Sequence, residues 1–255
     1  MADTLTLKVS GGIAQLEMNR PQQSNSFDLQ AARTFAAAVR KVESDEAVRV
    51  LLLTGAGKRF CAGGDVASMV VADDRNSYLK ELAEVLDGAL QHLDEMAKPV
   101  VVAVHGAVAG AGIGVMLAGD FVVAERSTKF LTAYAGIGLT PDCGVSWLLP
   151  RAIGQQRALQ LALTPKTLDG DEALAWGLVS EIVDEDANGR ARAVAEELAA
   201  GPTRALGQTR RLIRSSWSVD RARSGADESV TISKAVTEPE AAALIERFVS
   251  VTLQS

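Results

Sequence analysis

Apolar runs alternate along this chain with segments in which apolar residues recur every three or four positions. Two of the runs, VRVLLLT at 48–54 and PVVVAV at 99–104, are apolar almost throughout and lead into glycine-rich turns. This pattern is typical of strands that are buried on both faces of a mainly parallel sheet. Shorter apolar runs lie at 5–9, 13–18, 121–124, 129–133 and 178–183. The first two of these alternate around a Gly-Gly pair and predict a β-hairpin.

Helical spacing of apolar residues predicts helices between and after the strands. The clearest patterns span 29–39, 79–93, 190–200 and 237–249. The last of them is opened by Thr237 and Glu240, which form a capping-box pattern. We therefore predict a body over residues 1–190, which holds the ligand site, followed by a helical region over residues 191–255. No flexible linker divides the two parts, so the helical region is expected to pack on the body or on a neighbouring subunit.

The composition is that of a globular protein, since 47% of the 255 residues are hydrophobic and 23% are charged. A formal net charge of −6 argues against a nucleic-acid partner, because binding along a phosphate backbone needs a basic surface. The two cysteines and two histidines form no zinc-binding pattern, so no metal is expected. No secretory leader or membrane-spanning run is visible. We expect a cytoplasmic protein with reduced thiols and no membrane partner.

Two glycine-rich turns follow the buried strands, at 55–60 and at 110–115. A phosphate-binding loop of the dinucleotide type needs glycine at its third fixed position, where this chain has Phe60 and Val115. Glycines in such turns can simply allow tight bends and close helix contacts. Alternatively, backbone N–H groups from two turns can converge on one point and form an oxyanion hole, which stabilises a developing negative charge. The sequence leaves both interpretations open.

Several motifs, in order along most of the chain, resemble the crotonase superfamily of enoyl-CoA hydratases and isomerases. They are MNRP at 18–21, NSF at 25–27, FCAGGD at 60–65, HGAVAGAG at 105–112, GIGLTPD at 136–142, WLLPR at 147–151 and AWGLV at 175–179. The resemblance implies an α/β fold built as a spiral of ββα turns, with a helical C-terminal region that assembles a homotrimer or a dimer of trimers. It also implies an acyl-CoA thioester substrate and no separate cofactor, because coenzyme A is part of the substrate.

The resemblance also assigns residues to the site. It places the oxyanion-hole N–H groups at Gly64 and Ala111, although the family usually has glycine at the second position. The substrate-binding residues that it implies are Ala62, Gly63, Asp65, Val66, Met69 and Tyr134. The phosphates of coenzyme A would lie near Arg20, Lys58 and Arg59, and for the last two a solvated turn is an equally good interpretation.

The departures from the family pattern say most about the reaction. Hydratases of the family use two glutamates, and this chain has Gly114 and Tyr134 at the corresponding positions. Adding water to a double bond needs a base for the water and an acid for the carbon, so the usual machinery is missing. Asp142 stands where the phenylacetyl-CoA isomerases and 4-chlorobenzoyl-CoA dehalogenase have a catalytic aspartate. Asp142 is therefore the predicted catalytic residue, and the alternative is that it caps a helix that begins near Gly144.

We expect an acyl-CoA isomerase that shifts a double bond, or rearranges a ring, next to a CoA thioester through an enolate held in the oxyanion hole. Other functions stay open. An aryl-CoA dehalogenase or thioester hydrolase would use Asp142 as its nucleophile, and an enoyl-CoA hydratase would use Asp142 with a bound water. An inactive relative would bind only acyl-CoA or RNA. A Cys143 nucleophile is disfavoured, because no histidine lies near it in the sequence to activate the thiol.

Overall fold

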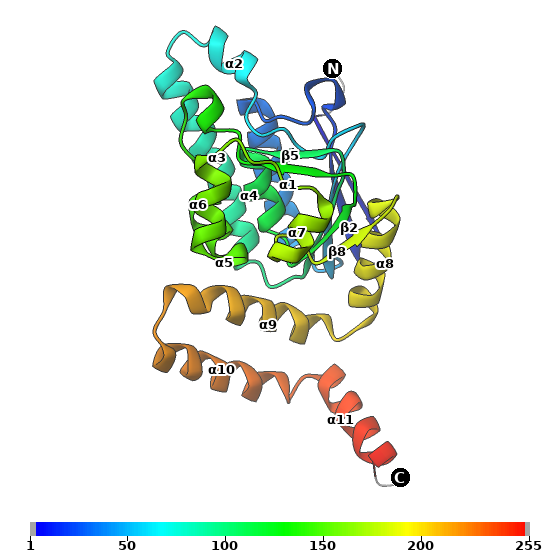
Figure 1. Ribbon diagram of the computed structural model, residues 1–255. Helices are drawn as coiled ribbons and strands as arrows, with labels where there is room; N and C mark the ends of the chain where they lie inside the picture. The colour runs from blue at the N-terminus through cyan, green and yellow to red at the C-terminus, as the bar shows by residue number, and fades with distance from the viewer. Residues whose placement is uncertain (1–3, 253–255) are drawn as a thin grey trace.

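The computed structural model describes residues 4–252, and its mixed α/β architecture is built on a six-stranded sheet (Figure 1). The strands follow the order β1, β2, β3, β4, β6, β8, and all neighbours are parallel except the β1–β2 hairpin. Their bounds are Leu5–Ser10, Ile13–Met18, Val50–Gly55, Val100–Val104, Phe121–Glu125 and Glu181–Val183. The hairpin turns at Gly11 and Gly12, whose φ angles of +59° and +79° suit glycine. The strands predicted from the apolar runs are confirmed.

Two short strands, β5 (Ala107–Ala109) and β7 (Lys129–Leu131), form a second, smaller parallel sheet. An isolated bridge between Cys61 and Val108 adds the turn after β3 to this sheet. The chain thus repeats a unit of two strands and a helix, and the predicted spiral of ββα turns is confirmed. β5 was not predicted, because three residues inside a glycine-rich segment show no periodic pattern.

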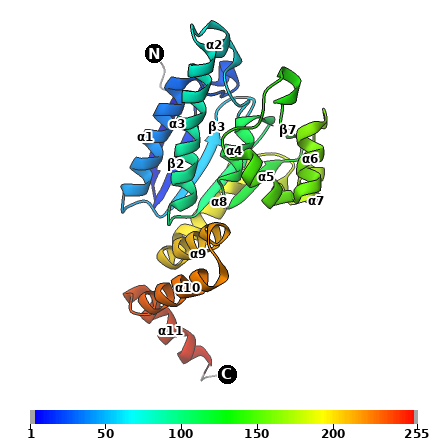
Figure 2. The same ribbon diagram turned by 90° about the vertical axis from the view of Figure 1, so that its left-hand side faces the viewer.

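Helices α1 (Leu29–Ser44) and α3 (Arg75–Glu95) cover one face of the large sheet (Figure 2). The two helices pack against each other, and Leu51 and Leu53 of β3 point into the same core. Phe35 of α1 is fully buried there. The helical spacing at 29–39 and 79–93 therefore marks the faces that these helices turn toward the sheet.

Helix α8 (Ala187–Ala200) covers the opposite face of the sheet, where Val50 and Leu52 of β3 point (Figure 1). Its buried stripe consists of alanines at every fourth position, which lie on one side of a helix. These are Ala187, Ala191, Ala195 and Ala199. Residue 190, the predicted boundary between body and helical region, lies inside α8. The first helix of the predicted C-terminal region is thus part of the core of the body.

Five shorter helices complete the body. They are α2 (Val66–Val71), α4 (Ala111–Leu117), α5 (Val145–Ile153), α6 (Gln155–Leu163) and α7 (Gly170–Trp176). α4 is buried from its first residue to Met116, and it packs against α5. Because α4 follows β5 directly, its N-terminal end lies beside the small sheet.

Three helices continue beyond the body: α9 (Thr203–Ser215), α10 (Arg221–Ala235) and α11 (Pro239–Thr252). α9 contacts α3, whereas α10 and α11 lead away from the body (Figures 1 and 2). No residue of α10 is buried, and apolar side chains of α11 such as Leu244 and Ile245 are exposed. Within the described residues, no helix is long and apolar enough to cross a membrane.

Two arginines of α9 fix this helix to the body. Arg210 is only 7% exposed, and its guanidinium group lies 2.6 Å from the carboxylate of Asp120. Arg214 pairs with the same carboxylate at 3.1 Å and with that of Asp94 at 2.6 Å. Both arginines also donate to the carbonyl oxygen of Ala118, next to the C-terminal end of α4. α9 therefore supports the helix whose other end borders the candidate site.

Candidate active site

The two glycine-rich turns, which lie far apart in the sequence, meet in the structure. The backbone of Cys61 runs beside β5: its N–H donates to Ala107 at 3.3 Å, and its carbonyl accepts from Ala109 at 3.0 Å. Gly63 then approaches the start of α4 so closely that a side-chain carbon there would lie 3.1 Å from the nitrogen of Ala111. Gly63 also has a φ angle of +92°, so both its conformation and its surroundings require glycine.

Where these turns meet, two backbone N–H groups have no acceptor among the described residues. Phe27 donates to the carbonyl of Gly63 and accepts from the N–H of Asp65, both at 2.8 Å, so this pairing passes over Gly64. Ala111 is the first residue of α4, and the first N–H groups of a helix have no partner within it. Neither Gly64 nor Ala111 donates a backbone hydrogen bond to another described residue. Such a pair of donors is the chemical requirement for an oxyanion hole.

Both residues line a cavity of about 460 Å³ between α2, α3, α4 and the segment around Tyr134. The residues predicted for the site that also line this cavity are Ala62, Gly64, Val66, Met69, Ala111, Tyr134 and Asp142. The Met69 side chain covers Gly64, since a side-chain carbon on Gly64 would lie 2.5 Å from the Met69 methyl group. One apolar cavity therefore holds two free N–H groups and one carboxylate, although these come from three separate stretches of the chain.

The carboxylate of Asp142 is held by Tyr134. The Tyr134 hydroxyl donates to Oδ1 of Asp142 at 2.7 Å, and both side chains are half-buried. Burial, and then the neighbouring Asp142 carboxylate, raise the pKa of Tyr134 well above its ordinary value. The phenol is therefore a neutral donor, and it occupies one oxygen of Asp142. Apart from the hydroxyl of Tyr134 and the neighbouring thiol of Cys143, no side chain of a described residue bonds to this carboxylate, so a substrate proton can reach it.

Asp142 does not cap the helix that follows it. Helix α5 begins at Val145, its N-cap residue is Gly144, and no side chain bonds to the free N–H groups of its first turn. Only the backbone carbonyl of Asp142 takes part, as the acceptor for the N–H of Val145 at 3.0 Å. The interpretation of Asp142 as a helix cap is therefore wrong.

The position of the first hydratase glutamate is filled by backbone. A side-chain carbon on Gly114 would overlap the carbonyl oxygen of Cys143 and lie 3.3 Å from its Cβ. Cys143 itself has a φ angle of +51°, which is uncommon for a residue with a side chain. Because this strained turn occupies the space above α4, no carboxylate fits at position 114, and among the described residues Asp142 is the only carboxylate that lines the cavity.

Two predicted site residues lie beside the cavity and support its wall. The guanidinium group of Arg20 pairs with Asp28 at 2.7 Å and with Asp65 at 3.0 Å. Asp65 is 9% exposed and is the N-cap residue of α2, because its carboxylate also accepts from the N–H of Ser68. These contacts place Asp65 outside the cavity and engage Arg20 with carboxylates, so neither prediction gains support from the structure.

The other basic residues predicted for the phosphates lie on an exposed turn after β3. Lys58 and Arg59 are both exposed, and Arg59 donates to the hydroxyl of Ser24 at 2.9 Å. They do not line the cavity. Their place on the turn that leads from β3 to Ala62 leaves them on the outer side of its wall.

Sequence patterns missed the part of the wall that α3 and the segment 132–141 provide. These residues are Asn76, Leu79, Lys80, Ala83, Thr132, Ala133, Ile137 and Thr140. Leu79 belongs to the apolar stripe of α3, which indicates only that the residue faces inward. Nothing in the periodicity separates a residue that faces the core from one that faces a cavity within it.

Neither the two thiols nor a metal site provides a second reaction centre among the described residues. Burial raises the pKa of Cys61 to about 12 and raises that of Cys143 as well. Since the thiolate is the reactive form, neither cysteine is suited to be a nucleophile. Among the described residues, no group of three or more histidines, cysteines or carboxylates could hold a metal ion.

Comparisons with known proteins show which family and fold this chain resembles. A family model described as enoyl-CoA hydratase/isomerase matches residues 8–243. The chain is 38% identical to 1,2-epoxyphenylacetyl-CoA isomerase of Escherichia coli K12, covering 84% of this chain and 83% of the relative. It is 32% identical to 4-chlorobenzoyl coenzyme A dehalogenase-2 of an Arthrobacter species, covering 82% and 77%. A crystal structure of a putative enoyl-CoA hydratase/isomerase from Mycobacterium abscessus superposes with a TM-score of 0.90 at 34% identity, with 96% of each chain covered.

Proposed function

Because the chain belongs to the enoyl-CoA hydratase/isomerase family, we propose that it is an acyl-CoA isomerase, which shifts a double bond or rearranges a ring next to the thioester. The observation that carries this proposal is the pairing of a single carboxylate, Asp142, with two free N–H groups in one cavity. Isomerisation removes a proton from one carbon and returns it to another, so one acid–base group is sufficient.

In the proposed mechanism, the thioester oxygen accepts hydrogen bonds from the N–H groups of Gly64 and Ala111. Asp142 removes a proton from the α-carbon, and the electron pair of that C–H bond moves toward the carbonyl to form an enolate. The two donors stabilise the negative charge on oxygen, and one such donor contributes roughly 3–4 kcal/mol in other enzymes. The enolate then collapses and takes the proton back from Asp142 at a different carbon, which leaves the double bond shifted.

Hydration is disfavoured because it needs a second acid–base group. Position 114 has no room for a carboxylate, and the hydroxyl of Tyr134 already donates to Asp142. The dehalogenase relative supports a different candidate, in which Asp142 attacks an aromatic ring that carries a leaving group. That reaction uses the same two N–H groups, and halide release distinguishes it from isomerisation.

A substrate panel tests the proposed function. Purified protein is mixed separately with a 3-enoyl-CoA, crotonyl-CoA and 4-chlorobenzoyl-CoA. Four reactions are measured: the shift of the double bond into conjugation with the thioester, hydration, halide release and release of free CoA. We expect isomerisation of the 3-enoyl-CoA to the conjugated 2-enoyl-CoA, with crotonyl-CoA hydration at no more than a few per cent of that rate. Faster hydration would favour a hydratase, and halide or CoA release without conjugation would favour a dehalogenase or hydrolase. Binding without any turnover would leave an inactive relative.

Two features outside the cavity belong to the same proposal. Lys58 and Arg59 are the basic residues still proposed for the CoA phosphates, and replacing both with alanine should weaken CoA binding and flatten its salt dependence.

The exposed helices α10 and α11 are proposed to pack in a homotrimer or a dimer of trimers. Light scattering at micromolar concentration measures the mass, and a monomer would contradict this assembly.

A further inference from the structure

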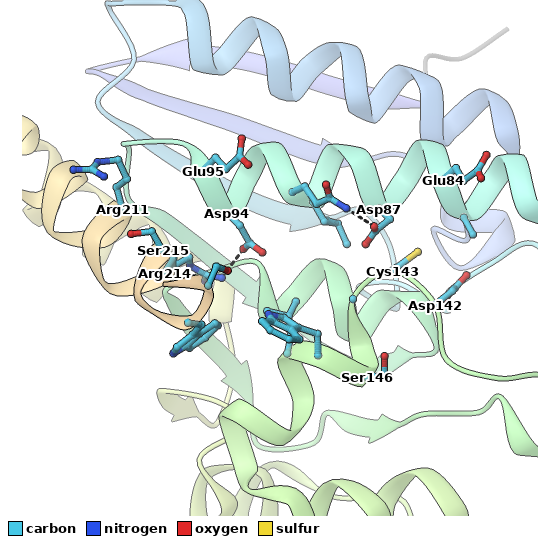
Figure 3. Close-up of a pocket in the computed structure, with 18 of the residues that line it drawn as sticks. Glu84, Asp87, Asp94, Glu95, Asp142, Cys143, Ser146, Arg211, Arg214 and Ser215 are labelled. Atoms are coloured by element: carbon cyan, nitrogen blue, oxygen red, sulfur yellow. Dashed lines mark hydrogen bonds and ion pairs between the residues drawn. The ribbon is translucent and has the colours of Figure 1, made fainter. Parts of the chain in front are cut away.

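Asp142 forms part of the wall between two cavities. Besides the cavity of the candidate site, Asp142 lines a larger groove of about 920 Å³ between α3, α5 and α9 (Figure 3). Of the residues that the structure describes, only Ala83 and Asp142 border both spaces. Two tryptophans, Trp147 and Trp217, lie 46% and 42% exposed along this groove. Asp142 thus borders the candidate site on one side and a wide groove on the other.

A second carboxylate, Asp87 of α3, lies on this groove side. It is half-buried, and it stands one helical turn after Ala83. A side-chain carbon on Gly144 would lie 3.7 Å from Oδ1 of Asp87, so the carboxylate reaches the turn that carries Asp142 (Figure 3). Oδ2 of Asp87 accepts from Gln91 at 2.6 Å. Asp87 therefore has one oxygen bonded to a described residue and one oxygen, Oδ1, without such a bond.

The other acidic residues of the groove are less suited to work with Asp142. Asp94 is paired with Arg214 at 2.6 Å, and Glu84 lies 3.7 Å from Lys80. Glu95 has no ion pair among the described residues, but it stands eight positions after Asp87, two turns farther along α3. Asp87 is therefore the carboxylate that combines closeness to the Asp142 turn with an oxygen free to bond water.

We propose that the groove is the solvent side of Asp142 and that Asp87 is a positioning residue that exchanges the abstracted proton with water. This inference rests on the proposed isomerase function. When Asp142 carries the substrate proton, it donates that proton to a water in the groove, and the same water donates a proton to the Asp87 carboxylate. Asp142 becomes a carboxylate, Asp87 becomes a carboxylic acid, and Asp87 then releases its proton to solvent. The reverse sequence returns a solvent proton to Asp142.

The consequence is that the product receives a solvent proton in place of the one removed from the substrate. Protiated 3-enoyl-CoA is isomerised in D₂O, the reaction is stopped at low conversion, and the product is analysed by mass spectrometry. We expect most product molecules of the wild-type protein to carry one deuterium. In Asp87→Asn the labelled fraction should fall because exchange slows by roughly 100-fold, the lower end of the range for a positioned proton-transfer group. The turnover number should stay close to that of wild type, because Asp142 is intact.

Glu95→Gln is the matched control, since it removes a carboxylate from the same groove and should leave the labelled fraction unchanged. An unlabelled wild-type product would overturn the inference, and so would equal labelling in wild type and Asp87→Asn. An equal fall in Glu95→Gln would overturn the role of Asp87, because it would indicate a general effect of the groove charge. Isomerisation itself reports on the proposed function, so a fast but unlabelled reaction would refute only the exchange route.

Discussion

The two ends of helix α4 differ in the hydrogen bonding of their backbone groups. At its N-terminal end, the N–H of Ala111 faces a cavity and has no acceptor among the described residues. Just past its C-terminal end, a single nitrogen of Arg214 lies 3.1 Å from the carbonyl oxygen of Ala118 and 2.7 Å from that of Gly119. Arg210 adds a further hydrogen bond to Ala118 at 3.1 Å.

This difference separates the part of the helix that stabilises the fold from the part available for chemistry. Buried backbone groups almost always find a partner, so the crowded C-terminal end follows the general rule. The open N-terminal end departs from that rule, and such departures concentrate at functional sites. Since Arg210 and Arg214 come from α9, the C-terminal helical region holds the helix from which the proposed site is built.

The largest expected effect is a loss of stability when the hydrogen bonds at the C-terminal end of α4 are removed. Replacing Arg210 with leucine leaves buried carbonyl groups and part of the Asp120 charge unpaired, which should cost about 3–5 kcal/mol in the free energy of unfolding. Urea denaturation measures this change. The matched control is Arg211→Leu, which removes a half-exposed pair with Asp227 and should cost about 1 kcal/mol or less. Equal losses for the two variants would show that the contacts at the end of α4 have no special weight.

The next effect is on turnover, at the open end. Proline is tolerated at the first position of a helix because the N–H there has no helical partner. Ala111→Pro should therefore fold, yet it removes one donor of the proposed oxyanion hole and should lower kcat by roughly 10²–10³-fold. Ala111→Gly keeps the N–H and should remain close to wild type. A folded proline variant with normal turnover would remove Ala111 from the proposed mechanism.

Much of the fold could be predicted because it depends on local patterns. The apolar strands and the stripe of α1 need only a buried face at a fixed period, and Gly11-Gly12 needs only a tight turn. The meeting of the two glycine turns could not be predicted, because it depends on pairing between Cys61 and β5 across the spiral. Arg210 was missed for a related reason: a charged residue on a helix normally indicates a solvated face.

The candidate site was predictable where a motif specifies backbone and less so where a side chain has a choice of partners. Gly64, Ala111 and Asp142 line one cavity, and their roles in the reaction stay predictions. Asp65 follows the same motif, yet its carboxylate turns to Arg20 and to the first turn of α2. The contribution of α3 to the wall arises only when the helix packs across the sheet, which no single stretch of sequence encodes.

A smaller effect concerns the partner of Asp142 at high pH. The pKa of Tyr134 is raised in the folded protein, so the folded state binds this proton more tightly than the unfolded state, whose tyrosines ionise near pH 10. Stability should thus be fully present below about pH 10 and should fall as the pH rises further. Denaturation of wild type and Tyr134→Phe from pH 8 to 11 tests this, because the variant should lose less stability. Parallel curves would contradict the raised pKa.

The smallest effect concerns the two thiols. The pKa values of Cys61 and Cys143 are raised by burial, so at pH 8 the folded protein should react slowly with a thiol reagent such as DTNB, and both groups should react after unfolding. Turnover should be unaffected by the reagent over the same period. Rapid modification of one thiol with parallel loss of activity would restore a role for Cys143.

The most direct test of the account is the replacement Asp142→Asn. Asparagine keeps the size of aspartate and an oxygen that can accept from Tyr134, but it cannot take up a proton as a carboxylate does. Because Asp142 caps no helix, stability and the dissociation constant for an acyl-CoA ester should stay near their wild-type values. We predict that isomerisation of a 3-enoyl-CoA falls by roughly 100-fold or more, together with deuterium exchange at the α-carbon. A stable variant that isomerises at close to the wild-type rate would contradict the assignment of Asp142 as the proton carrier.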